Sequence, residues 1–289
     1  MIRSMLFLPG NNPNMLANGD VLGADAIIFD LEDAVSMDEK DSARILVRNT
    51  LESRDYSKIK VLIRINPVDD NDFWEKDLEE IVPLAPDYIM PPKVSGKDYI
   101  KTLVKKLEKL EKRHKIEEGT IKLIPLLETA VGIENAYKIA TSSERIKGLF
   151  LGGEDLTADL GCPRTKEGNE ILYARGRIIM AAKAAGISVY DTPFVDINDD
   201  EGLVKDTMFA KSMGFTGKVA ISPRHVGVIN SIFSPTQKEI DYACEVLEAI
   251  EEAKRQGKGA IALYGKMIDA PIVARAEQTL EIARQIGLS

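Results

Sequence analysis

The chain has 289 residues, with 38 Lys or Arg against 46 Asp or Glu, so its formal net charge is −8 at pH 7. This acidic balance argues against a nucleic-acid partner, because phosphate backbones are themselves negative. The 44% apolar and 29% charged residues are typical of a soluble globular protein. No apolar run approaches the roughly 18 residues that a membrane span requires, and the first residues do not read as a signal peptide. We therefore expect a cytoplasmic protein with no membrane partner.

Histidine and cysteine are scarce. The two cysteines, Cys162 and Cys244, lie far apart and lack the spacing of a zinc site or a disulfide framework. The two histidines, His114 and His225, leave little material for a histidine-based triad. If the protein is an enzyme, its chemistry must therefore use carboxylates, arginine, lysine or a bound ion. His225 follows an apolar run, where a histidine more often packs or caps than catalyses, and its role stays open.

Short apolar runs bounded by turn residues recur about every 31 residues, which is the size of a strand with its crossover helix and loops. Each run is followed by a stretch with helical periodicity. This rhythm predicts an α/β fold, a TIM (β/α)8 barrel. The eight predicted strands are residues 4–8, 26–31, 61–65, 87–90, 122–127, 148–151, 187–190 and 218–221.

Helical periodicity is clearest over residues 42–51, 99–114 and 169–185, which we expect to be outer helices of the barrel. Two further helices are predicted after the eighth strand, over residues 236–256 and 272–286, with a glycine-containing stretch between them. The sequence thus predicts a catalytic barrel over residues 1–233 and a C-terminal helical tail over residues 234–289.

Polar residues gather directly after the predicted strands, where catalytic groups of barrels lie. Up to six carboxylates share this rim with two or three cations. Because like charges in a low-dielectric mouth repel, such a rim needs a compensating cation, and oxygen ligands without Cys or His favour Mg²⁺. Glu128 and Asp155 are the preferred metal ligands. The alternative is that these acids cap helices or form salt bridges, and for Asp33, Glu154 and Asp191 the two interpretations are about equal.

Three further features of the rim are candidates for ligand binding. Arg64 lies in an otherwise apolar strand, where it could grip a substrate carboxylate or form a permanent pair with Asp30 or Glu32. Lys93 could form a Schiff base, anchor a phosphate or be a solvated charge, and its sequence context leaves these open. Gly152 and Gly153 permit close backbone approach and could offer amide donors to a carboxylate.

Together these motifs resemble the HpcH/HpaI aldolase and citrate lyase β-subunit family. The resemblance runs from Arg3 to the last predicted helix. It rests on the strings RSMLFLPG (3–10), FDLEDAV (29–35) with Lys40 and Ala43-Arg44 after it, LET (127–129), GGEDL (152–156), NEILYAR (169–175), YDTPFVDIND (190–199) and SPTQKEID (234–241).

The resemblance implies a Mg²⁺-dependent barrel enzyme that cleaves an acyl thioester carried by CoA or by a carrier protein. The residues are assigned by match of motif. Glu128 and Asp155 match the metal carboxylates, Arg64 the substrate-gripping arginine, Gly152 to Glu154 the loop around the keto acid, Glu32 and Asp33 acids near the metal waters, and Arg3 and Lys93 contacts to the thioester cofactor's phosphates. The string GKMID (265–269) resembles a tail segment that carries an aspartate, here Asp269, into a neighbouring subunit's site, so the tail is expected to act as a lid in a homotrimer or a multiple of it.

The leading hypothesis is a carbon–carbon lyase that cleaves a citryl thioester to oxaloacetate and an acetyl thioester, working with the acyl carrier and transferase subunits of a citrate lyase complex. Arg64 and Asp269 would be its catalytic residues, with Asp269 or a metal-bound water moving the proton. A stand-alone lyase for malyl-CoA or citramalyl-CoA is the alternative. A non-catalytic, metabolite-binding or regulatory subunit is the third hypothesis. The sequence does not determine the acyl group, the carrier or the oligomer count.

Overall fold

The computed structural model describes residues 1–69, 71–255 and 261–288 of the chain. It divides into two units, which are described separately here. The first unit is Ile2–Asn230 and holds all nine strands of the large sheet. The second comprises Met1 and Ser231–Ser289. Among the described helices, none combines the length and the apolar character that a membrane span requires.

The first unit is built on a parallel sheet, which confirms the predicted α/β class. Its strand order is β5-β4-β3-β2-β1-β9-β8-β7-β6, and every described pairing between neighbours in it is parallel. The strands are β1 (Ser4–Pro9), β2 (Ala26–Asp30), β3 (Lys60–Arg64), β4 (Tyr88–Met90), β5 (Lys122–Leu123), β6 (Leu126–Leu127), β7 (Gly148–Leu151), β8 (Ser188–Asp191) and β9 (Gly217–Ala220).

The predicted fifth strand is broken into β5 and β6. Pro125 lies in the gap, and proline has no N–H to donate to a neighbouring strand. Its carbonyl still accepts from the amide of Phe150, while the amides of Ile124 and Leu126 donate to Ile89 and Pro91. The two ends of the sheet order are therefore separated by two residues in the chain.

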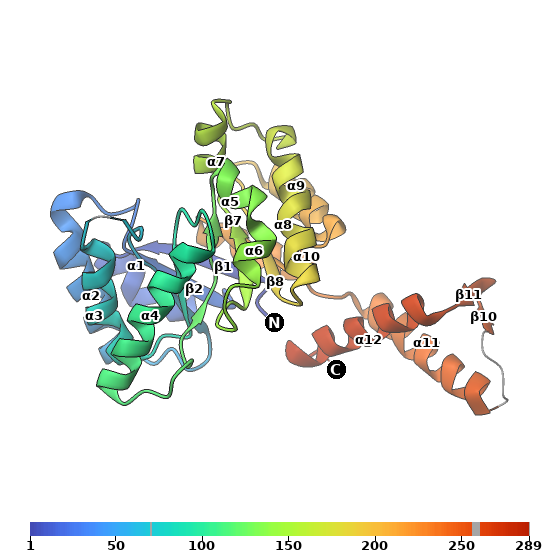
Figure 1. Cartoon of the computed structure of the whole chain (residues 1–289). Coiled ribbons are helices and arrows are strands. Elements are labelled where there is room, and N and C mark those ends of the chain that lie inside the picture. Colours follow the sequence, from blue (N-terminus) through green and yellow to red (C-terminus); the bar gives the residue numbers. More distant parts are fainter. Residues whose placement is uncertain (70, 256–260, 289) are drawn as a thin grey trace. The chain divides into compact units, whose positions relative to one another are not determined.

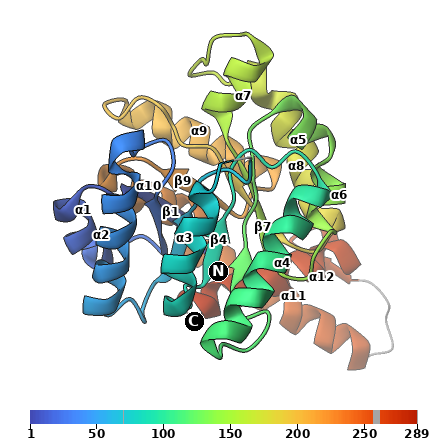
Figure 2. The same cartoon turned by 60° about the vertical axis from the view of Figure 1, so that its left-hand side comes forward.

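Helices cover the outer face of this curled sheet, as Figures 1 and 2 show for the blue to green segments. Neighbouring helices pack on one another from α1 through α2, α3, α4 and α6 to α8. Those of the first unit are α1 (Pro13–Asn18), α2 (Lys40–Ser53), α3 (Phe73–Ile81), α4 (Lys97–His114), α5 (Ala130–Glu134), α6 (Ala136–Ala140), α7 (Gly153–Leu160), α8 (Leu172–Ala184) and α9 (Asp200–Met213). The next helix, α10 (Pro223–Phe233), contains the boundary between the units, after Asn230. Short 3-10 turns are η1 (Gly19–Val21), η2 (Met37–Glu39), η3 (Val82–Leu84) and η4 (Asn169–Ile171).

Side-chain alternation along the strands explains the core. Successive residues of a strand face opposite sides of the sheet, so every second side chain points inside the curled sheet and the others point toward the helices. The inner cluster draws on every part of the sheet. It contains Ile2, Met5, Ala26, Ile28, Leu62, Met90, Ile124, Leu126, Phe150, Tyr190 and Val219.

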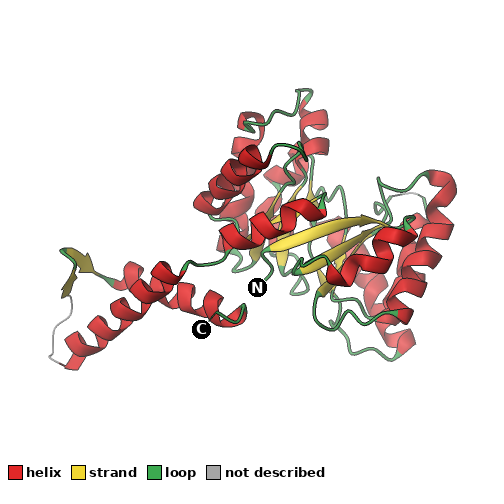
Figure 3. Ribbon diagram, turned by 180° about the vertical axis from the view of Figure 1, so that it is seen from behind, coloured by secondary structure: helices red, strands yellow, loops and turns green. Residues whose placement is uncertain are grey.

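The second unit contains α11 (Gln237–Arg255) and α12 (Ala270–Gln285), which match the two helices predicted for the tail within two residues at each end. Figure 3 shows a small two-stranded sheet, which the sequence analysis did not predict. It pairs β10 (Ile261–Leu263) with β11 (Lys266–Ile268) in antiparallel register. Tyr264 and Gly265 both have positive φ, at 50° and 75°, as a tight primed hairpin turn requires.

Candidate active site

A cavity of about 600 Å³ opens at the carboxyl ends of the strands in the first unit. Parallel strands bring these ends to one edge, so residues distant in sequence meet there. The cavity has apolar walls, including Phe7 and Phe150, and several charged groups. Of the residues predicted for the site, it is lined by Asp33, Arg64, Glu128, Gly152, Gly153, Glu154 and Asp155.

Arg64 ends β3 and is held by the residue that ends the neighbouring strand. Its Nε and Nη2 lie 2.7 and 2.5 Å from the two carboxylate oxygens of Asp30, in a bidentate pair. Its guanidinium also lies 4.7 Å from the ring centre of Phe7. Burial would lower the pKa of Arg64, but the nearby acids, Asp30 foremost, raise it. The pairing that the sequence left as an alternative is thus present, and it orients Nη1 toward other acids of the mouth.

Two of those acids are shared between cations. Glu32 lies 3.1 Å from Nη1 of Arg64 and 2.7 Å from Nζ of Lys93. Asp33 lies 3.6 Å from each of these two nitrogens. Burial raises the pKa of Glu32, and Arg64 and Lys93 offset this only in part. Lys93 therefore closes an ion-pair network at the mouth, and with a side chain 41% exposed it still reaches solvent.

Glu128 is the most perturbed acid of the cavity. It follows β6 and is 3% exposed, and burial, with Glu32 and Asp155 nearby, raises its pKa to about 9. One oxygen accepts the backbone N–H of Lys93 at 2.7 Å. The other faces Gly152, where an added Cβ would lie 2.7 Å from it and 2.6 Å from the Glu128 Cβ. Glycine at this position therefore makes room for the Glu128 carboxylate.

Asp155 reaches the cavity from the first turn of α7, which begins at Gly153 just after β7. The amide of Gly152 donates to Leu127 and that of Gly153 to the hydroxyl of Thr192, so both are used internally. The next two amides, of Glu154 and Asp155, have no carbonyl in the helix to bond because they belong to its first turn. A helix start with such amides attracts anionic groups. Glu154 itself is mostly exposed and lies 3.6 Å from Arg164.

The residues present fit a hard divalent cation. Within the described residues neither Glu128 nor Asp155 has an ion-pair partner, whereas Glu32 and Asp33 each have two. The burial of Glu128 raises its pKa and so favours its protonated form when no cation is bound. No described group of three or more His, Cys, Asp or Glu could enclose a metal by itself. A pair of carboxylates that leaves the other positions to water and substrate is the arrangement that Mg²⁺ accepts.

Two predicted residues are not among those brought together here. Arg3 precedes β1, at the opposite ends of the strands, and its guanidinium pairs with Asp25, which precedes β2. The contact of Arg3 to the thioester cofactor's phosphates, which the resemblance implied, stays a prediction. Asp269 belongs to the second unit, where its side chain caps α12 by accepting from the amide of Ile272. Its catalytic role stays a prediction.

Other rim residues have structural environments. Asp191 is fully buried between Arg175 and Lys218, so the salt-bridge interpretation is correct for it. His225 is 1% exposed and burial lowers its pKa, as in a packed neutral histidine. Thr192, which lines the cavity, and Lys218, which donates to its carbonyl, were not predicted from the sequence. A lysine within the apolar strand Gly217–Ala220 is the signal that could have revealed Lys218.

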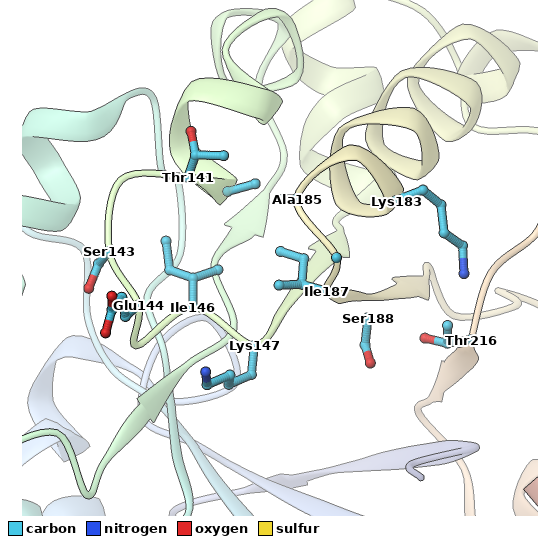
Figure 4. Close-up of a pocket in the computed structure, with 12 residues that line it drawn as sticks. Thr141, Ser143, Glu144, Ile146, Lys147, Lys183, Ala185, Ile187, Ser188 and Thr216 are labelled. Atoms are coloured by element: carbon cyan, nitrogen blue, oxygen red, sulfur yellow. The ribbon is translucent and has the colours of Figure 1, made fainter. Parts of the chain in front are cut away.

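A second cavity, of about 690 Å³, lies at the other ends of β7, β8 and β9 (Figure 4). Lys147, Lys183, Ser188 and Thr216 line it. It holds none of the residues predicted for the site. Because reacting groups of such folds gather at the carboxyl ends, we place the active site in the smaller cavity.

The fold is α/β, and acids and one anchored arginine gather in a cavity at the carboxyl edge of its parallel sheet. A family model described as HpcH/HpaI aldolase/citrate lyase matches residues 3–223. The chain belongs to this family, and it is a lyase. The citrate lyase subunit beta of Leuconostoc mesenteroides is 42% identical over 97% of this chain and 93% of its own length. The human mitochondrial citramalyl-CoA lyase is 34% identical over 98% of this chain and 86% of its own.

Two solved structures of related proteins are also similar to this chain. The CitE protein of Mycobacterium tuberculosis, in complex with magnesium, acetoacetate and coenzyme A, is similar with a TM-score of 0.79 and 30% identity, covering 98% of each chain. The citrate lyase beta subunit of the same organism, with oxaloacetate and magnesium, is similar with a TM-score of 0.68 and 30% identity, over 80% of this chain and 96% of its own.

Proposed function

We propose that this chain is a Mg²⁺-dependent lyase that cleaves a citryl thioester to oxaloacetate and an acetyl thioester. One observation carries the proposal. The two acids predicted to hold the metal, Glu128 and Asp155, line one cavity together and are without ion-pair partners among the described residues, whereas Glu32 and Asp33 beside them are paired. The similarity to citrate lyase beta subunits at 39 to 42% identity supports this substrate.

The chain's own residues would bind the keto-acid end of the substrate. Arg64, fixed by Asp30 and ion-paired through Nη1 with Glu32, lines the cavity and would bind a substrate carboxylate there. The amides of Glu154 and Asp155 offer further donors at the start of α7. The apolar side chains of Phe7 and Phe150 in the cavity wall lower the local polarity, which would strengthen these charged contacts. Orienting the substrate in this way lowers the entropy cost of the reaction.

The cleavage needs a proton to move twice. The hydroxyl beside the carboxylate loses its proton as the C–C bond breaks, its carbon becomes the keto carbon of oxaloacetate, and the bond's electrons form a thioester enolate. Protonation of that enolate carbon gives the acetyl thioester, so no oxidant or reductant is required. Mg²⁺ held by Glu128 and Asp155 supplies a Lewis acid that lowers the pKa of this hydroxyl. Asp269 of a neighbouring chain is our candidate for moving the proton.

The architecture around the site is part of the proposal. We infer that the curled sheet is a closed (β/α)8 barrel, since its end strands β5 and β6 are consecutive in the chain and the amide of Leu126 donates to Pro91. Residues 1–233 would form the barrel and residues 234–289 a lid over a neighbour's site in a homotrimer or its multiple. Lys93, half exposed beside the mouth, is our candidate contact to the phosphates of the thioester carrier. A cytoplasmic location and an acyl carrier partner stay predictions.

A stand-alone acyl-CoA lyase is the second candidate. Mitochondrial citramalyl-CoA lyases match 98% of this chain at 33 to 35% identity, which favours it. Steady-state kinetics with citryl, citramalyl and malyl groups on CoA and on a carrier protein would separate the two. A regulatory subunit is disfavoured because the cavity retains its acids and its arginine.

The direct test supplies a citryl thioester with Mg²⁺ and follows oxaloacetate. We expect turnover by the wild type and a loss of at least about 100-fold in Asp155→Ala, since a missing metal ligand removes most of the transition-state stabilisation. Lys101→Ala, a change on the exposed face of α4, is the control and should retain activity. Absence of oxaloacetate with the wild type, or unimpaired turnover in Asp155→Ala, would refute the proposal.

A further inference from the structure

Four charged side chains are buried directly beneath the active-site edge of the sheet. They are Arg175 from α8, Asp191 from the end of β8, Asp206 from α9 and Lys218 from β9. Arg175, Asp191 and Lys218 are fully buried and Asp206 is 9% exposed. Two cations and two anions balance in this cluster, which we call the buried ion network. Burying these charges is costly, and their ion pairs with one another offset part of that cost.

Lys218 connects the network to the residue above it. Its Nζ lies 2.6 Å from Asp191, 2.6 Å from Asp206 and 2.6 Å from the carbonyl oxygen of Thr192. The ammonium group donates to Asp191 and to Thr192, and its contact to Asp206 is an ion pair. Arg175 completes the cluster, with Nε 3.0 Å from Asp191 and Nη2 2.7 Å from Asp206. The backbone of Thr192 is therefore fixed by a buried charge.

Thr192 in turn contacts the first residue of α7. Its hydroxyl oxygen accepts the backbone N–H of Gly153 at 3.0 Å. Thr192 is 1% exposed and lines the cavity. An added Cβ on Gly153 would lie 2.8 Å from this hydroxyl, so the two residues are in close contact. Gly153 stands between Gly152, which makes room for Glu128, and Asp155. The position of this helix start therefore depends on Thr192.

We propose that Thr192, braced by the buried ion network through Lys218, is a positioning residue that holds the start of α7 so that Asp155 faces Glu128 across the cavity. This inference rests on the proposed function for the role of Mg²⁺, but it concerns how the chain positions the carboxylate of Asp155. Thr192 touches no reacting atom in this account. It acts through the amide of Gly153.

The experiment compares Thr192→Val, which keeps the shape but removes the hydroxyl, with Thr192→Ser, which keeps the hydroxyl. Isothermal titration with Mg²⁺ alone measures the metal affinity, and citryl thioester cleavage measures kcat and KM. We expect Thr192→Val to weaken Mg²⁺ binding and lower kcat by about 3- to 10-fold, as for the loss of one hydrogen bond, with little change in KM. Thr192→Ser should stay within about twofold of the wild type in each quantity.

Thr216→Val is the matched control. The hydroxyl of Thr216 also accepts a backbone N–H, that of Val189 at 2.9 Å. This contact lies at the end of β8 that is away from the proposed active site. The Thr216→Val variant should have a lower melting temperature and an unchanged Mg²⁺ affinity and kcat. The inference is overturned if Thr192→Val binds Mg²⁺ and turns over as the wild type does, if Thr192→Ser loses as much, or if Thr216→Val shows the same losses. If the wild type binds Mg²⁺ but does not cleave the citryl thioester, the proposed function is refuted instead. The Mg²⁺ affinities of the variants would then still test the inference.

Discussion

The charges at the mouth of the cavity are divided between paired and unpaired acids. Asp30 is committed to Arg64, and Glu32 is shared by Arg64 and Lys93. From the described part of the chain, Glu128 receives only the backbone N–H of Lys93. A carboxyl group in such surroundings favours its neutral form unless a cation enters. This division, at the level of single residues, explains why the metal would bind beside Glu128 and not at the paired acids.

The raised pKa of Glu128 predicts how stability depends on pH. Its pKa is about 9 in the folded chain, against an ordinary 4.5, so the folded state retains a proton that the unfolded state releases between those values. Without metal, the free energy of unfolding should therefore fall as pH rises from about 5 to 9. Glu128→Gln, which is neutral at every pH, should show a smaller slope in thermal unfolding with a chelator present. Equal slopes for both proteins would contradict the account.

Metal binding should be coupled to the loss of the same proton from Glu128. Mg²⁺ would bind the ionised form of Glu128, so binding near pH 7 should release close to one proton. Isothermal titration in buffers of different ionisation enthalpy measures this number. A value near zero would indicate that Glu128 is already ionised or does not hold the metal.

Arg64→Lys tests the anchored guanidinium. Lysine keeps the charge but cannot bond both oxygens of Asp30 and also face the substrate. We expect KM for the thioester to rise about 10- to 100-fold, in line with the loss of a bidentate charged pair. Kinetics should show this while circular dichroism shows a folded protein. An unchanged KM would mean that Arg64 only holds Asp30.

At the scale of elements, the site depends on how strands end and α7 begins. Strand spacing in the sequence predicted every strand of the large sheet, because an apolar run bounded by turn residues is a local signal. The break at Pro125 was not predicted, and neither was the hairpin of β10 and β11, whose strands are only three residues long. Glu128 and Asp155 were predicted because both follow strands. The buried ion network was not, because four charges from α8, β8, α9 and β9 meet only through the tertiary fold.

Gly152→Ala tests the close approach of α7 to β6. The added Cβ would collide with the Cβ and carboxylate of Glu128 at 2.6 and 2.7 Å. Overpacking of this kind costs about 1 to 3 kcal/mol, and here it should also weaken Mg²⁺ binding. Gly176→Ala in the middle of α8 is the control, since its Cβ would meet no atom within 4 Å. It should stabilise the fold by about 0.5 to 1 kcal/mol and leave Mg²⁺ affinity unchanged. Equal effects in thermal unfolding and titration would rule out the contact.

At the scale of the whole molecule, our proposal predicts a site to which two chains would contribute. Asp269 lies in the second unit, and the acids and Arg64 lie in the first. A heterologous contact that closes a ring would give each site residues from two chains. The sequence suggested this only through the family resemblance, since nothing in the local pattern of the tail indicates which chain it serves.

Complementation tests that sharing. Asp269→Asn keeps a capping side chain for α12 but removes the charge, and Arg64→Ala removes the substrate anchor. Each variant alone should be nearly inactive. When the two are refolded together, randomly mixed rings should regain about a quarter of wild-type activity, because a site then needs one intact residue from each of two neighbours. Activity that stays at the level of the separate variants would place both residues in one chain's site.

The central claim is that Glu128 and Asp155 hold the metal while Arg64 and the start of α7 hold the keto acid. A crystal structure of the protein with Mg²⁺ and oxaloacetate tests it most directly. The account predicts one ion bound by oxygens of both carboxylates at about 2.1 Å, with an oxaloacetate carboxylate in contact with Arg64. An ion bound at other residues, or oxaloacetate outside this cavity, would contradict it.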